Sequence, residues 1–263
     1  MNQYYSKKDI DYSSQYVAPL TQEASGSLIM KTYLNVVGAV AAFTLITIGL
    51  FMGMGVENFV GFVTANSKAF MLVMILLCFG APFLTQALIG PGASRAMQYT
   101  ALGLYVLMEV AILAPILAFA TIAFGLGIIF QAIGLSVSLF IALSAVVFMT
   151  RQDFSFLRSL LFFATIGSLI TIVFAMIFHM SLGIFFCGLM VLLMGGYVLY
   201  ETSTMLLHAG EDDDVRCAVM LFSTLMTLFF YILRILMIFA GGRRLAARKR
   251  VLRHRASFRR IYE

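Results

Sequence analysis

Three ionisable side chains interrupt the long apolar stretches of this sequence: Glu109, Glu201 and Arg234. A charged group near the middle of a bilayer costs about 2.5–3.5 kcal/mol or more unless it is paired, so each is a candidate functional residue. Arg234 stays charged at any accessible pH, and we expect Glu201 or Glu109 to pair with it. Carboxylates can exchange protons, and their oxygen atoms can bind a cation.

Each acidic feature also has a structural interpretation. Glu201 could lie among lipid headgroups at the end of a helix, and Glu109 could be a neutral carboxyl group that is hydrogen-bonded to a neighbouring helix. The acidic run at 211–214 could bind a divalent ion, or it could place anions at the N-terminus of the following helix.

Other chemistries find no support in the residue pattern. The three histidines are scattered, the three cysteines follow no metal-ligand spacing, and no Gly-rich phosphate loop followed by a lysine is present. No lysine lies within a predicted span, which excludes a retinal Schiff base. We therefore expect neither an enzyme nor a cofactor.

The elements that must position these residues are membrane helices. The chain is 62% hydrophobic and only 11% charged, whereas soluble domains are about 25% charged. We predict an all-α integral membrane protein with a polar N-terminal segment (1–32), a membrane domain (33–240) and a basic tail (241–263). A span needs about 20 apolar residues, and seven segments qualify: 33–54, 69–90, 98–120, 125–149, 157–178, 182–207 and 216–240. We expect close helix contacts at small residues, including Gly38, Gly125, Gly195 and Gly196.

Two groups of basic residues give conflicting information about orientation. Most lysines and arginines between the spans lie on one side, which predicts a cytoplasmic N-terminus. The tail is also expected to be cytoplasmic, although seven crossings from a cytoplasmic N-terminus would place it outside. Its nine basic residues are Arg243, Arg244, Arg248, Lys249, Arg250, Arg253, Arg255, Arg259 and Arg260. The last segment could dip in and return, or it could lie at the centre of the bundle, where Ser223, Thr224 and Thr227 would be shielded from lipid. We expect the tail to bind anionic lipid headgroups, and we expect no nucleic-acid partner.

Three stretches resemble the Bax inhibitor-one family. Residues 151–161 (RQDFSFLRSLL) are similar to the family's loop before its fifth helix, and 197–202 (YVLYET) resemble its apolar-Leu-Tyr-Asp-Thr signature. Residues 221–234 resemble its last helix, which ends in Leu-Arg, here Leu233 and Arg234. Together with Pro115, the resemblance covers roughly residues 30–240 and suits a bacterial-type member.

The resemblance implies six transmembrane helices around a central seventh and, in some members, a calcium leak that is gated by protons. In those members two Asp residues on the last two helices share a proton across the pore. Here Glu201 matches the first Asp, but Thr224 stands at the second position. We expect Glu109 to supply the missing carboxylate, so that it forms one cluster with Glu201, Arg234 and Thr224. In a leak of the kind that the resemblance implies, Glu201 and Glu109 are the expected transient calcium ligands.

Two functions follow as expectations. The first is a pH-sensitive pathway for calcium or other cations. The second is a non-conducting interaction protein that modulates other membrane proteins, such as a membrane-bound protease, as the resemblance to bacterial members suggests. In either case the chain contacts the lipid bilayer, and a bacterial inner membrane with the N-terminus in the cytoplasm is the expected location.

Overall fold

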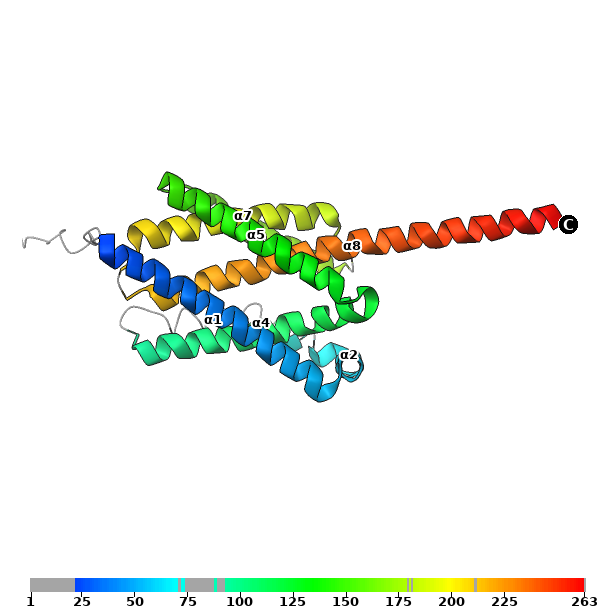
Figure 1. The fold of residues 1–263 in the computed structure, drawn as a ribbon, viewed down its shortest axis with the longest axis horizontal. Coiled ribbons are helices and arrows are strands. Elements are labelled where there is room, and N and C mark those ends of the chain that lie inside the picture. The colour runs from blue at the N-terminus through cyan, green and yellow to red at the C-terminus, as the bar shows by residue number, and fades with distance from the viewer. Residues whose placement is uncertain are drawn as a thin grey trace, which may run out of the picture.

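The computed structural model describes residues 22–70, 72–73, 88, 93–178, 180, 182–210 and 212–262, and within these ranges the regular structure is entirely helical. The helices are α1 (Gln22–Met54), α2 (Val56–Ala65), α4 (Arg95–Phe124), α5 (Leu126–Thr150), α6 (Leu157–Ile177), α7 (Ile184–His208) and α8 (Asp214–Tyr262) (Figure 1). Six of them contain a stretch long and apolar enough to cross a membrane. The predicted 69–90 span lies almost wholly outside the described residues, so the total of seven spans stays a prediction.

The last helix occupies the centre of the bundle, as predicted. Of the apolar stretch of α8 that could cross a membrane, 56% is buried inside the protein. The corresponding share in α6 is 6%. Helix α8 packs against α1, α4, α5 and α7, whereas α6 packs only against α7 within the described part of the chain. The apolar side chains of Phe222, Leu228 and Leu233 are completely enclosed. Lipid therefore has little access to α8.

Helix α8 runs without a break from Asp214 to Tyr262, so the alternative in which the last segment dips in and returns is wrong. Its first residue contacts α1 and α4, and Leu236 to Arg243 lie beside the α4–α5 turn at the other end of the bundle. The tail leaves the bundle at the end opposite to the start of α1 (Figure 1). The two groups of basic residues thus lie at opposite ends, and the positive-inside rule cannot hold for both.

Glycine forms the sharp turns at the end that lies opposite Asp214. Gly125 separates α4 from α5 with φ 85°, and Gly55 separates α1 from α2 with φ 76°. Residues with a Cβ atom rarely adopt such positive φ values, because the Cβ atom would clash with the backbone. Glycine has no Cβ atom and therefore suits both positions. At the other end, Ser94 caps α4 by accepting a hydrogen bond from the backbone N–H of Met97 at 3.3 Å.

A polar network joins three helices where α8 begins. The carboxylate of Asp214 accepts hydrogen bonds from Arg95 on α4 and from Asn35 on α1, the latter at 3.2 Å. Thr32 on α1 donates to the backbone carbonyl of Asp214 at 3.3 Å. Arg95 also pairs with Asp212 at 2.8 Å. Asp212 and Asp214 of the acidic run thus place anions at the start of α8, as the structural interpretation of these residues predicted.

This network predicts unequal effects of two neutralising substitutions. The Asp214 side chain is 3% exposed and that of Asp212 is 90% exposed. Asp214→Asn should cost about 2 kcal/mol of stability, less than a fully buried pair because Arg95 is partly exposed to solvent. The matched control Asp212→Asn should cost less than about 0.5 kcal/mol. Thermal unfolding in detergent micelles measures both, and equal midpoints would contradict the assignment.

Candidate functional site at the central helix

A direct hydrogen bond joins the candidate residues of α7 and α8. The Thr224 hydroxyl donates to both carboxylate oxygens of Glu201, at 2.9 Å to Oε1 and 2.8 Å to Oε2. Glu201 is 8% exposed and Thr224 is 5% exposed. Glu201 therefore points into the bundle rather than outward to lipid or solvent.

Glu109 approaches the central helix through a tyrosine. It is buried on α4 and interacts with the hydroxyl of Tyr105, one helical turn earlier on the same helix. The Tyr105 hydroxyl lies 2.6 Å from the Ser223 hydroxyl on α8, and either oxygen could donate the hydrogen bond. Glu109 is thus linked to α8 indirectly, through Tyr105 and Ser223, rather than by contact with Thr224.

The predicted pairing of Arg234 with an acid is wrong. Its Nη2 atom donates to the backbone carbonyl of Leu182 at 3.4 Å, and none of the ion pairs found within the described residues includes it. Arg234 lies ten residues after Thr224, which is about 15 Å along a helix. A guanidinium at that distance cannot reach Glu201, so a backbone carbonyl near the start of α7 becomes its partner.

The structure thus divides the predicted cluster of four residues. Glu201 and Thr224 are bonded to each other, Glu109 joins through two hydroxyls, and Arg234 is separate. Tyr105 was not among the predicted site residues, although its position four residues before Glu109 places both on one helix face. Within the described residues, no group of three or more His, Cys, Asp or Glu could hold a metal ion.

Comparison with known proteins agrees with this architecture. The family model described as "Inhibitor of apoptosis-promoting Bax1" matches residues 26–241, which is most of the chain. The chain belongs to the Bax inhibitor-one family. It is therefore an integral membrane protein of this family, as its six candidate spans also indicate.

Three bacterial relatives match part of the chain. One is the "Modulator of FtsH protease YccA" of Escherichia coli K12, which is 33% identical over 127 residues, or 48% of this chain and 57% of the relative. The "Inner membrane protein YccA" of E. coli O6:H1 gives the same values. An uncharacterised Pseudomonas aeruginosa protein is 32% identical over 121 residues, or 45% of this chain and 53% of the relative. Each match thus spans little more than half of the relative's length.

The family's loop motif has a structural role in this chain. Asp153 accepts hydrogen bonds from the backbone N–H of Ser155, at 2.8 Å, and from its hydroxyl. These bonds form a turn just before α6 begins at Leu157. The backbone N–H of Phe154 donates to Ser203 on α7 at 3.3 Å. The loop thereby connects the start of α6 to α7, two residues from Glu201.

The Glu201–Thr224 bond gives the second prediction. Thr224→Val keeps the side-chain shape but leaves a buried carboxyl group without its donor, which should cost about 1–3 kcal/mol. Thr224→Ser should restore most of the stability. The matched control is Thr227→Val on the same helix, whose hydroxyl bonds only to the Ser223 carbonyl at 2.9 Å. Unfolding midpoints in detergent test this, and equal losses for Thr224→Val and Thr227→Val would contradict it.

The loop gives the third prediction. Hydrogen bonds from the Ser155 side chain and backbone lower the pKa of Asp153, with a smaller contribution from nearby His208. Because the folded-state pKa is lowered, the stability from Asp153 is present above its unfolded pKa and is lost as the pH falls through the folded pKa. Ser155→Ala should raise the folded pKa and reduce this loss.

The measurement for this third prediction is the unfolding midpoint of each protein between about pH 3 and pH 5. The Ser155→Ala profile should be flatter than that of the wild type. Ser159→Ala, an exposed substitution on the first turn of α6, is the control and should leave the profile unchanged.

Proposed function

We propose that this protein is a non-enzymatic, non-conducting protein of the bacterial inner membrane, which binds another membrane protein and modulates it. A membrane-bound protease is the partner class that the name of the E. coli relative suggests. The observation that carries the proposal is the bond from Thr224 to Glu201, which stands where a proton-gated member would have two carboxyl groups.

The hydrogen bond from Thr224 to Glu201 holds α7 and α8 together and does not depend on the protonation state of Glu201. Two adjacent carboxyl groups attract when they share a proton and repel when both are ionised, so loss of the shared proton can separate two helices. A hydroxyl can donate to an ionised carboxylate and can accept from a protonated one. The contact between α7 and α8 therefore persists in either protonation state of Glu201, and pH has no pair of charges through which to open it.

The exposed surface offers places for a protein partner. Helix α6 packs only on α7 among the described residues, and it presents Phe162 and Phe163 outward at 58% and 70% exposure. Large exposed apolar patches are where protein or lipid contacts form. We assign the partner contact to α6, and contact with anionic lipid headgroups to the basic tail that follows Arg243. The cytoplasmic N-terminus and the absence of a nucleic-acid partner remain part of this proposal.

A pH-sensitive cation leak is the second candidate. One observation favours it: Tyr105 lies within electrostatic range of both Glu109 and Glu201, so the two buried acids share one polar region beside α8. In this function the two carboxylates would bind calcium transiently, as oxygen ligands do in calcium sites.

One set of experiments separates the two functions, and it is the fourth prediction. Purified protein in liposomes should give no calcium flux above that of empty liposomes at acidic or neutral pH. Thr224→Asp, which restores the second carboxyl group, should create a pH-dependent flux, and adding Glu201→Gln should remove it. In membranes that contain a membrane-bound protease, the wild-type protein should copurify with the protease and change its rate of substrate degradation.

Two outcomes would overturn the proposal. The first is calcium flux through the wild-type protein that loses its pH dependence in Glu109→Gln, which would establish the leak instead. The second is a protease whose degradation rate is the same with and without the protein. A Phe162→Ala, Phe163→Ala double variant tests α6 itself, because it should weaken copurification while leaving the unfolding midpoint unchanged.

A further inference from the structure

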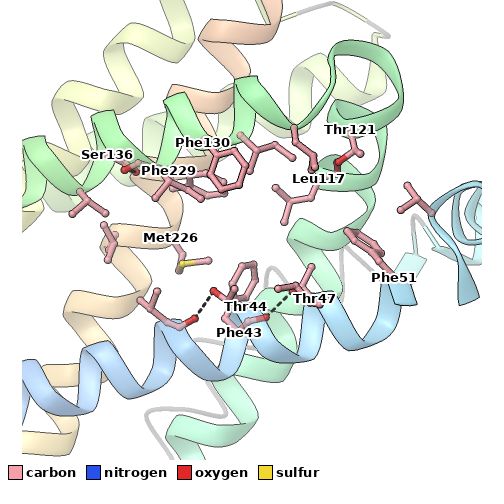
Figure 2. A pocket seen from close by; sticks show the side chains of 18 residues that line it. Phe43, Thr44, Thr47, Phe51, Leu117, Thr121, Phe130, Ser136, Met226 and Phe229 are labelled. Carbon is pink, nitrogen blue, oxygen red and sulfur yellow. Dashed lines mark hydrogen bonds between the residues drawn. The ribbon is translucent and has the colours of Figure 1, made fainter. Parts of the chain in front are cut away.

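An apolar crevice separates α1 from α5 in the half of the bundle that holds the Gly55 and Gly125 turns. Within the described residues, the backbones of α1 and α5 do not come close to each other, although both helices pack against α4 and α8. The crevice has a volume of about 540 Å³. Phe43 and Thr47 lie on one wall, Phe130 and Ser136 lie on the other, and Met226 and Phe229 of α8 form the floor (Figure 2).

The hydroxyl groups along the crevice are already satisfied by their own helices. Thr44 donates to the Val40 carbonyl and Thr47 to the Phe43 carbonyl, both at 2.8 Å, and Figure 2 shows these two bonds as dashed lines. Thr121 and Ser136 likewise donate to carbonyls one turn earlier, at 2.8 Å each. The crevice therefore offers its occupant no free hydroxyl proton, and it contains no charged side chain. An apolar cavity of this kind excludes water and binds apolar ligands.

The size of the crevice limits what can enter it. A helix with its side chains is about 10 Å across, so a volume of this size would hold only about five residues of one. A transmembrane helix of a partner cannot fit into it. A flexible hydrocarbon chain can, and cavities of roughly 300–1,000 Å³ are typical of sites for single small ligands.

The crevice is continuous with the lipid-facing surface. Leu126, Phe130 and Ile133 of α5 and Ile48 of α1 line it and are also exposed. The adjoining exposed side chains, Leu45 on α1 and Ile141 on α5, are equally apolar. In a membrane these surfaces touch acyl chains, and an empty crevice beside them would forfeit the dispersion contacts of its walls.

We propose that this crevice binds one acyl chain of a bilayer phospholipid, which reaches between α1 and α5 to the central helix α8. Leu225, which also lines the crevice, directly follows Thr224. The bound acyl chain therefore touches α8 next to the contact between Thr224 and Glu201. The site is independent of the proposed protease partner and of any ion flux.

Tryptophan fluorescence tests the proposal, because the chain contains no Trp and each substitution therefore creates a single reporter. Phe229 and Phe222 are both buried on α8, at 6% and 0% exposure, but only Phe229 lines the crevice. In vesicles of phosphatidylcholine brominated on its acyl chains, Phe229→Trp should be quenched about as strongly as Leu192→Trp, a lipid-exposed position on α7. Phe222→Trp should be quenched little. Equal, weak quenching of Phe229→Trp and Phe222→Trp would overturn the proposal.

Two further measurements use a substitution that fills the crevice, and the second of them does not depend on a Trp in the core. Thr44→Phe fills the mouth of the crevice, whereas Leu45→Phe changes a neighbouring exposed residue outside it. In the Phe229→Trp background, only Thr44→Phe should remove the quenching. Native mass spectrometry of the otherwise unchanged chain, extracted in mild detergent, should show one retained phospholipid that Thr44→Phe loses and Leu45→Phe keeps. Absence of bound lipid from the wild-type protein, or its retention in Thr44→Phe, would overturn the proposal.

Discussion

The structure depends on one constraint: polar groups on a helix that lipid scarcely touches must find partners inside the protein. Hydrocarbon offers no hydrogen bonds, so each such group is matched by a neighbouring helix or by its own backbone. Thr224 bonds to Glu201 on α7, Ser223 to Tyr105 on α4, and Asp214 to groups on α1 and α4. These contacts are spread along α8. They fix its rotation and depth against α1, α4 and α7, which apolar packing alone would leave less specific.

Much of this arrangement could be predicted from the sequence. Runs of about 20 apolar residues mark spans because the bilayer sets their length. Four of the predicted segments coincide with helices to within a few residues, and the first and last predicted segments lie within the longer helices α1 and α8. The position of Thr224 opposite Glu201 followed from the family motifs. Arg234 was assigned wrongly, because the cost of burying a charge predicts that a partner exists but does not say which one. A single sequence gives distances along one helix, and only the packing of α7 showed that the Leu182 carbonyl lies within reach.

The glycine residues also show that a single sequence does not give the packing between helices. A Cβ atom on Gly196 would lie 2.9 Å from a Leu161 side-chain carbon, so α6 and α7 approach closely there, as expected. At Gly38 and Gly125 nothing would lie within 4 Å of an added Cβ atom. Gly125 is needed for its positive φ rather than for a close contact. Glycine is used for two different physical reasons, and composition does not distinguish them.

The replacement of a family carboxyl group by Thr224 changes what the central contact can do. A pair of carboxyl groups couples helix separation to pH because its energy reverses sign with ionisation, whereas a hydroxyl–carboxyl bond keeps the same sign in both states. The second acid of this chain, Glu109, lies on a different helix and reaches α8 through Tyr105 and Ser223. Thr224, rather than a second carboxyl group, is thus the direct hydrogen-bond partner of Glu201. A contact between α7 and α8 that holds in both protonation states of Glu201 suits a fixed surface for a partner better than it suits gated conduction.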